Sequence, residues 1–545
     1  MLGGSDSSDP DHGLEKGDHM KGRRMGWRIG ALGSVVALVV IALGVVGQSA
    51  FAGPSATTLV DGTTDSITNL DPAGAYDYGT QTLMGNVYEH LLDFKHGPKL
   101  EPSLATRCVS VGTLATWRCT LRRGVEFSDG SAFDSADVKF SFDRVSNKTI
   151  VKEAAANTPS SLLGNLKSTT TNGKYAVTFR LKSPQATWPA VLATQAAYIV
   201  PSDTYEPNHL RGNSEEQIGT GPYVLTKYSP GQQAVFTRNE SYWGTPAKTD
   251  NLIIRYYSKS STMKLAIQRG EIDMSYQSFT PNEITSLQKQ KGLRVYNGAG
   301  GRIRYLTFNV TRPPANNVAV RRAVAYLMPR QTIAARVYHG QVKPLFSMVP
   351  AGYPGHIDAF ASLYGRTPNP AKAKAVLQAA GLSTPLAIEV WYTPTHYGDA
   401  SADEYAEIKR SLERDGVFSV TLKSSEWAQY SSVLGNQYNV YQLGWFPDYP
   451  DSENYLVPFY RNDTFTASGY NSPAMEKLIK LELASKTLAQ RIRLIKSIQL
   501  LAAKDVPIVP YWQQSMIVVG RSNVRGIPST LDPTVLMRFW LLSKS

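Results

Sequence analysis

Cysteine is almost missing from this sequence, with two in 545 residues, and this excludes a small scaffold held together by disulfides. Charged residues are also sparse at 19%, whereas aromatic residues reach 10%, a composition that excludes a mainly disordered chain. Only one long apolar run occurs, at residues 29–47, so a protein with several membrane spans is excluded as well. The length instead predicts two to four folded domains, at roughly 150 residues each.

Common catalytic and nucleotide-binding motifs are missing too. The sequence holds no HExxH, GxSxG, P-loop or CxxC motif, and no pair among its eight histidines has the spacing of metal ligands on one helix face. Carboxylate pairs such as Asp448 and Asp451 are present, but hydrolysis also needs a pocket and a partner acid. We therefore expect a protein that is not an enzyme and that holds no metal or cofactor.

The first 52 residues have the composition of an export signal. A basic flank at 21–28 precedes the uncharged run 29–47, and Ala50-Phe51-Ala52 then offers a small-x-small cleavage site. As a helix the run is about 28 Å long, close to the thickness of the hydrocarbon core. Two alternatives stay open: a cleaved signal peptide, or a retained membrane anchor behind a polar cytoplasmic tail. Either one places the body outside the cytoplasm, in the periplasm or at the outer face of the membrane or cell surface.

The net charge of +13 falls on the exported part, because residues 1–52 hold as many acidic as basic side chains. Such a charge favours attraction to anionic lipids or wall polymers. The basic residues are dispersed, without a Lys/Arg block or an Arg-rich helix, so nucleic acid is not expected as a partner.

The two cysteines flank a short predicted hairpin. Cys108 and Cys119 lie equally far from a centre between Thr113 and Leu114, so a hairpin centred there brings them opposite each other. In an oxidising compartment this pattern favours one cross-strand disulfide. Two unpaired buried thiols are the alternative.

Strand and helix patterns are intermixed from Thr57 to the end, which predicts the α/β class. Helix-start residues precede several apolar-periodic segments, and glycines follow some of them. The predicted elements are strands at 177–181 and 386–393, helices after Asn369-Pro370 and Ser472-Pro473, a helix opened by a capping box of Ser401 and Glu404, and a helix at 488–505 capped by Thr487.

Residues 100–145, from LEPSLATRC to VKFSFDRV, resemble the signature of the extracellular solute-binding proteins of family 5, which serve peptide- and nickel-type ABC importers. The resemblance extends over about 57–545. Further matches follow in the order of the family: IGTGPYVL (218–225), NESYWG (239–244), AIQRGEIDM (266–274), FNVTRPPANNVAVRRAVAY (308–326) and GWFPDYPDSENYL (444–456).

The resemblance implies a two-lobe fold of the class II periplasmic-binding-protein type, with an additional inserted domain and a two-strand hinge. Mapped onto this sequence, lobe I takes 57–81, 201–301 and 506–545, the inserted domain 82–200, and lobe II 302–505. The hinge then falls near 300–305 and near 505–510.

The implied function is that of an ABC importer's extracytoplasmic solute-binding component. It captures peptides, with oligopeptides favoured, between two lobes that close over them. It then delivers them, as a monomer, to a membrane permease and its ATPase subunits. The alternatives are the same fold with another solute (an oligosaccharide, a metal chelate or a signalling peptide), or a surface sensor without a permease.

The segment 444–456 supplies the main predicted ligand contacts. In peptide-binding relatives the Asp that follows this Gly-Trp pairs with the ligand's α-ammonium, and by position that residue is Asp448. Its alternative role is to cap a turn before Pro450. Trp445 and Phe446 beside it are expected to offer an apolar wall, with core packing as the alternative for Trp445. Asp451 and Glu453 are expected to shape the turn and the following helix start.

Further candidates come from the hinge strand and the N-terminal loop. Residues 301–310 are expected to offer a strand edge to an extended peptide, with Tyr305 facing the cleft and Arg302 or Arg304 as attractors of a carboxylate. From loop 69–80, the resemblance adds Asp71, Tyr76 and Tyr78 as lining residues.

One departure from the resemblance bears on specificity. Strict dipeptide binders place an Arg two residues before a Tyr-x-Pro in lobe II to hold the ligand's carboxylate, whereas here Val390 precedes Tyr392. This departure favours longer peptides. His396 follows nearby, either at the cleft or in a surface loop.

Overall fold

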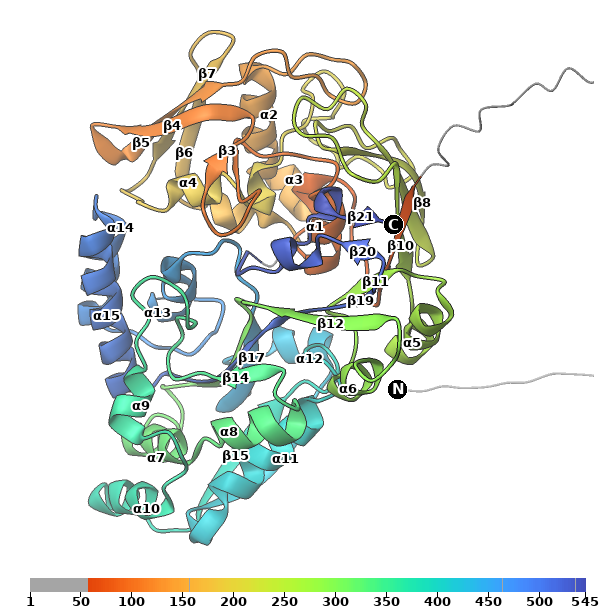
Figure 1. The fold of residues 1–545 in the computed structure, drawn as a ribbon. Helices are drawn as coiled ribbons and strands as arrows, with labels where there is room; N and C mark the ends of the chain where they lie inside the picture. Colours follow the sequence, from red (N-terminus) through yellow and green to blue (C-terminus); the bar gives the residue numbers. More distant parts are fainter. Residues whose placement is uncertain (1–56, 156, 463, 535) are drawn as a thin grey trace, which may run out of the picture. The chain divides into compact units, whose positions relative to one another are not determined.

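The computed structural model describes residues 57–155, 157–462, 464–534 and 536–545. The predicted export signal, with the apolar run 29–47, lies outside the described residues. Among the residues that are described, no helix is long and apolar enough to cross a bilayer. The described strands gather into three larger sheets and two short strand pairs (Figure 1).

The first sheet, of lobe I, is mixed and has seven strands in the described chain, with β1 near its middle. Strand β1 (Thr58–Thr63) pairs in parallel with β10 and β11, and none of its residues is exposed, which fits a strand between two packed faces. Helix α5 (Ser260–Arg269) packs against β1, and helix α6 (Pro281–Leu287) packs against β12 of the same sheet. The strand order is β12 (Leu293–Gly298), β19 (Met516–Arg521), β11 (Met274–Tyr276), β1, β10 (Asn251–Tyr256), β9 (Gln233–Arg238) and β8 (Tyr223–Ser229).

The second sheet, of lobe II, has six strands in the described chain, and β13 (Ile303–Phe308) is buried along its whole length between β17 and β18. Its order is β14 (Val342–Pro344), β18 (Ile508–Gln514), β13, β17 (Val440–Trp445), β15 (Leu386–Tyr392) and β16 (Phe418–Ser424). The helices of this part of the chain are α7 (Val318–Leu327), α8 (Arg330–Thr332), α9 (Ala359–Tyr364), α10 (Pro370–Ala379), α11 (Ser401–Leu412), α12 (Trp427–Ser432), α13 (Val457–Tyr460), α14 (Pro473–Leu483) and α15 (Leu488–Asp505).

The expected boundary between the lobes, which gave 506–545 to lobe I, is wrong for strand β18. It pairs with β13 on one side and β14 on the other, so it belongs to the sheet of lobe II. The chain passes from β18 to β19, and so to the other sheet, at Ser515. The second hinge segment therefore lies near Gln514–Met516 and not at 505–510.

The first crossing, at 299–302 between β12 and β13, runs beside the second. The backbone N–H of Gln514 donates to the carbonyl of Arg302 at 2.9 Å. A Cβ at Gly300 would lie 2.1 Å from the carbonyl oxygen of Gln514, so only glycine allows this approach. Two adjacent connections thus join the sheets, as a two-strand hinge requires.

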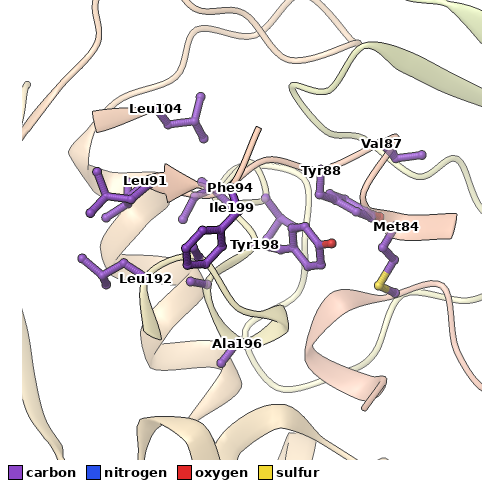
Figure 2. Packing of buried hydrophobic residues seen from close by; sticks show 14 of the residues in the cluster. Met84, Val87, Tyr88, Leu91, Phe94, Leu104, Leu192, Ala196, Tyr198 and Ile199 are labelled. Atoms are coloured by element: carbon purple, nitrogen blue, oxygen red, sulfur yellow. The ribbon is translucent and has the colours of Figure 1, made fainter. Parts of the chain in front are cut away.

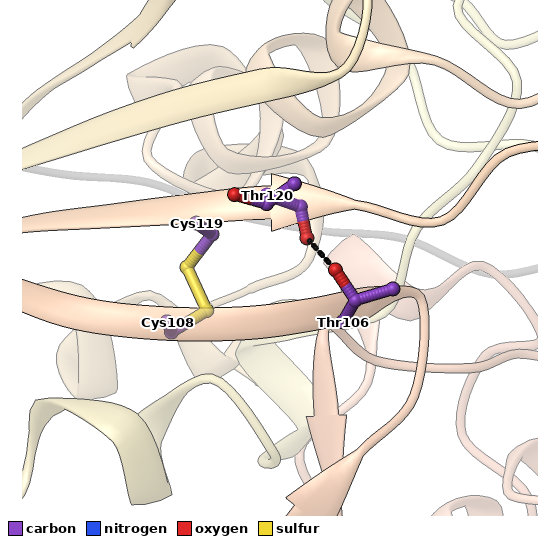
Figure 3. Close-up of a disulfide and its surroundings, with 4 residues drawn as sticks. All are labelled: Thr106, Cys108, Cys119 and Thr120. Carbon is purple, nitrogen blue, oxygen red and sulfur yellow. Dashed lines mark hydrogen bonds between the residues drawn. A yellow bond between two sulfur atoms is a disulfide. The ribbon is translucent and has the colours of Figure 1, made fainter.

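The inserted segment 82–200 carries a four-stranded antiparallel sheet in the order β4 (Ala105–Val111), β5 (Thr113–Leu121), β7 (Ala176–Leu181) and β6 (Leu166–Thr171). Helix α2 (Ser135–Val145) packs against β6 and β7. Cys108 and Cys119 are direct partners in the ladder of β4 and β5 and form the predicted disulfide, with their Cα atoms 4.1 Å apart (Figure 3). Beside it, the Thr106 hydroxyl donates to the Thr120 carbonyl.

The inserted segment shares its apolar core with lobe I. Residues that follow helix α1 (Tyr78–Met84), among them Tyr88 and Leu91, pack with Leu192, Tyr198 and Ile199 from the far end of the insert (Figure 2). The same cluster of buried residues continues to Leu59 of β1 and Val518 of β19. The insert is therefore fastened to lobe I by a continuous core, whereas lobe II has apolar clusters of its own.

Local end signals placed several helices correctly. Ser472 accepts from the backbone of Met475 at the start of α14, and Thr487 accepts from Gln490 at the start of α15. The prediction of a capping box formed by Ser401 and Glu404 is wrong. Ser401 is already inside α11, whose N-cap Ala400 has no side-chain bond, and Glu404 turns into the core.

Candidate functional site

A cavity of about 1470 Å³ is lined by residues of both lobes. Lobe I contributes Asp65, the loop 76–79 and the segment 277–281, and lobe II contributes the loops 395–400 and 444–448. The volume exceeds the roughly 300–1,000 Å³ of ordinary small-molecule pockets. The cavity therefore has room for a ligand of several residues.

Asp448 lies in this cavity with its carboxylate held in place by both lobes. The Tyr76 hydroxyl donates to Oδ1 at 2.6 Å, and the Asn454 side-chain amide donates to Oδ2 at 3.0 Å. The backbone N–H of Asp448 in turn donates to Oδ1 of Asn454 at 3.0 Å. Burial raises the pKa of Asp448, while the bonds from Asn454 and Tyr76 oppose that rise. A carboxylate offers about four acceptor positions, so these two donors leave capacity for a cation.

The aromatic residues beside Asp448 also line the cavity. Trp445 is half-buried, stacks on Phe465 with ring centroids 5.3 Å apart, and donates from its indole N–H to Asn454 Oδ1 at 3.0 Å. Trp445 thus packs in lobe II and also borders the cavity. Phe446 is exposed to the cavity and is paired there with Tyr78 of lobe I.

Arg302 lies between these two aromatic rings. Its guanidinium carbon is 4.2 Å from the ring centre of Tyr78 and 4.4 Å from that of Phe446. Each ring face attracts the cation. The hinge residue thus contacts one aromatic side chain from each lobe.

Tyr305 does not face the cavity as expected. It is 0% exposed, and its ring packs edge-on against Phe459 at 5.4 Å. Side chains alternate across a strand, and Arg302 and Arg304 point to the cavity, which turns Tyr305 to the interior of lobe II. The strand edge expected at 301–310 is also absent in the described structure, because β17 and β18 occupy both sides of β13.

Asp71 has a structural position instead of a place in the cavity lining. It is 0% exposed, caps the short helix Pro72–Gly74, and accepts from the guanidinium of Arg144 at 2.6 and 2.5 Å. Arg144 is at the end of α2, so this buried ion pair ties the N-terminal loop to the inserted segment. Among the loop candidates, Tyr76 and Tyr78 remain in the cavity.

A second wall of the cavity surrounds Arg304. The ring of Tyr397 lies 3.9 Å from its guanidinium carbon, and His396 stacks on Trp427 at 3.7 Å. Desolvation and the nearby charge of Arg304 lower the pKa of His396 to about 4, so this imidazole is neutral at pH 7. Among the described residues, no group of three or more His, Cys, Asp or Glu side chains could hold a metal ion.

Sequence reasoning missed the roles of Asn454, Tyr397 and Trp427. Asn454 lies inside the motif 444–456, which was its only signal, and it orients both Trp445 and Asp448. Tyr397 comes from the loop 395–400 and Trp427 from the start of helix α12, and nothing in their local sequence marked them. Asp451 behaves as expected, since it caps the turn at Ser452–Tyr455, and it also pairs with Arg491.

Comparison with known proteins identifies the family. The sequence model of the bacterial extracellular solute-binding proteins, family 5 Middle, matches residues 99–467, which is more than half of the chain. The chain belongs to this family. Its similarity to family 5 proteins extends well beyond the matched segment.

Two curated relatives show the extent of that similarity. The dipeptide-binding protein of Escherichia coli is 26% identical over 90% of this chain and 96% of its own length. The glutathione-binding protein GsiB of Salmonella paratyphi A is 24% identical over 88% of this chain and 93% of its own length.

Solved structures share the family 5 fold. The periplasmic binding protein DppA from Helicobacter pylori, in complex with the peptide STSA, superimposes with a TM-score of 0.76 at 24% identity, covering 89% of this chain and 98% of that one. AppA from Clostridium difficile, described as a putative peptide-binding protein, reaches 0.78 at 17% identity, covering 89% and 100%. The fold is therefore the two-lobe α/β periplasmic-binding-protein type with an inserted segment and a two-strand hinge.

Proposed function

We propose that this protein is the exported solute-binding component of an ABC importer and that it captures peptides in the cavity between its lobes. Family membership supports the general role, and relatives named for dipeptides and glutathione support a peptide-like solute. A membrane permease with its ATPase subunits then receives the solute, and the protein itself performs no chemical step.

The observation that carries the proposal is the carboxylate of Asp448 in the cavity. A desolvated carboxylate is costly unless it is paired and hydrogen-bonded, and a peptide's α-ammonium supplies both a charge and three donors. Tyr76 and Asn454 fix the two oxygens, so the ammonium meets a carboxylate that is already oriented. Trp445, Phe446 and Tyr78 border the space where the first side chains of the peptide lie.

Export is part of the same proposal. The basic flank at 21–28, the apolar run 29–47 and Ala50-Phe51-Ala52 support it. A cleaved protein diffuses outside the cytoplasm, whereas a retained segment tethers the protein to the membrane next to its permease.

The test compares Asp448→Asn with wild type, using peptides with a free amino terminus and the same peptides N-acetylated. We expect the substitution to weaken binding of free-amine peptides by roughly 10- to 100-fold, the range for hydrogen bonds to charged groups. N-acetylated peptides should bind weakly to both proteins. The measurement is calorimetric titration of ligand-free protein.

Asp399→Asn is the matched control, because Asp399 is an exposed carboxylate of the same cavity. It should keep the preference for the free amine. Equal loss of free and acetylated peptides in Asp448→Asn would refute an amine-specific role.

A further inference from the structure

A buried cation in the cavity has no assigned partner. Arg304 is 5% exposed and lines the cavity. Among the described residues, the only hydrogen bond of its side chain runs from Nη2 to the carbonyl of Tyr397, at 3.3 Å. Its Nε and Nη1 atoms are buried without an acceptor. Unsatisfied charged donors are expensive to bury, so this arrangement points to an acceptor that arrives with a ligand.

The surroundings of Arg304 hold the guanidinium in position. It lies over the ring of Tyr397 and 4.8 Å from the ring centre of Trp512. Gly444 is its partner across the β13–β17 ladder, and a Cβ there would come within 2.3 Å of Nη1. The glycine that opens the motif 444–456 therefore makes room for this side chain.

The buried carboxylate of Glu404 does not accept from these free donors. Burial lowers the pKa of Arg304, but the charge of Glu404 and the neighbouring tyrosines outweigh it and raise the pKa; no hydrogen bond between Arg304 and Glu404 is present in the described structure. The oxygens of Glu404 instead accept from Tyr338, Gln442, Tyr511 and Trp512.

The N-terminal end of a helix follows the cavity-lining loop that contains Tyr397. Helix α11 begins at Ser401, directly after the cavity-lining loop 395–400, and its N-cap has no side-chain hydrogen bond. The N-terminal end of a helix carries partial positive charge and favours anions. Asp399 in that loop, together with Asp403 and the buried Glu404 in the first turn of α11, opposes this effect. The unpaired donors of Arg304, and not the helix end, therefore favour an anion here.

We propose that Arg304 is the anion-binding residue of the cavity and that it holds the C-terminal carboxylate of the bound peptide. This proposal rests on the peptide-binding function proposed above. An arginine matches a carboxylate with charge-assisted hydrogen bonds, which no neutral group of the cavity wall can replace. Val390, which stands where strict dipeptide binders place an arginine, is 0% exposed and apolar, and Arg304 supplies the cation from a different strand of the same sheet.

The experiment offers ligand-free protein an equimolar mixture of two peptide libraries of two to five residues. Both libraries have free amino termini, one has free carboxyl termini, and the other is C-terminally amidated. Retained peptides are identified by mass spectrometry. We expect wild-type protein to enrich the free acids by roughly 10- to 100-fold, and Arg304→Gln to reduce the ratio of acids to amides to near one.

Two further variants keep the test decisive. Arg304→Lys keeps the positive charge and provides a second test if Arg304→Gln fails to fold. It should prefer acids over amides, but more weakly than wild type. Arg269→Gln, at the exposed end of α5, should leave the ratio unchanged. Melting curves report whether each variant folds.

The outcomes separate the two proposals. Retention of both libraries without a preference for acids overturns the role of Arg304 and leaves the peptide-binding function standing. An acid preference as strong as that of wild type, in any Arg304 variant that folds, also overturns it. Retention of neither library overturns the proposed function itself.

Discussion

Glu453 is a buried acid within the motif 444–456. It is 3% exposed, and burial together with the charge of Glu482 raises its pKa to about 8. The hydroxyl of Tyr449 donates to its carboxyl group. At neutral pH the folded protein therefore holds Glu453 mostly protonated, whereas in the unfolded chain this residue is ionised above its ordinary value of 4.5.

This difference predicts how stability depends on pH. Between about 4.5 and 8 the folded state binds the proton that the unfolded state has lost, so the free energy of unfolding falls as pH rises through this window. Glu453→Gln imitates the protonated acid and should lose less stability from pH 5 to pH 8. Urea unfolding at each pH measures the two slopes, with Glu240→Gln, whose side chain is 76% exposed, as the control. Identical slopes for wild type and Glu453→Gln would contradict the assignment.

Some individual site residues could be predicted from the sequence, and others could not. Asp448, Trp445 and Phe446 lie in one motif, and all three border the cavity. The orientation of Tyr305 depends on which face of β13 is turned to the cavity, and one residue of shift reverses it. The prediction that Asp71 lines the cavity is wrong, because Asp71 forms a buried ion pair with Arg144. Arg144 is distant in the sequence, so the residues around Asp71 do not indicate this pair.

Among the elements, the hairpin of β4 and β5 is fastened by its disulfide. Cys108 and Cys119 are 11 positions apart, and closing a loop of this size stabilises a fold by roughly 3 kcal/mol in the chain-entropy account. We expect the double substitution Cys108→Ala with Cys119→Ala to lower the free energy of unfolding by about that amount.

The measurement is equilibrium urea unfolding with and without a thiol reductant. The wild-type midpoint should fall when reductant is present throughout, whereas the midpoint of the double variant should not respond. A wild-type midpoint that equals that of the double variant under oxidising conditions would show that the disulfide adds no stability.

Elements with local end signals were predictable, and those fixed by distant pairing were not. The caps of α14 and α15 lie within three residues of the groups that they satisfy. The place of β18 in lobe II depends on pairing with β13, about 200 positions earlier, and no local pattern carries that information. The sequence likewise predicts Arg304 as a candidate site residue but not its unpaired buried donors, because these depend on residues that are distant in the sequence.

At the scale of the whole molecule, several contacts at the cavity join the two lobes. The hydroxyl of Tyr76 in lobe I reaches Asp448 in lobe II, and Arg302 lies between Tyr78 and Phe446. A peptide that occupies the cavity adds its own contacts to both lobes, so it favours the arrangement in which the lobes are close. The adjacent crossings near Gly300 and Ser515 are where the chain must turn for the lobes to separate.

Closure can be followed by small-angle X-ray scattering with and without a bound peptide. We expect the radius of gyration of the wild-type protein to decrease on binding. In Tyr76→Phe, which removes one hydrogen bond between the lobes, we expect roughly tenfold weaker peptide binding and an unchanged decrease at saturation, because the peptide supplies the larger share of the closing contacts. Thr106→Val, beside the disulfide and remote from the cavity lining, serves as the control. Superimposable scattering profiles of free and saturated wild-type protein would show that capture proceeds without movement of the lobes.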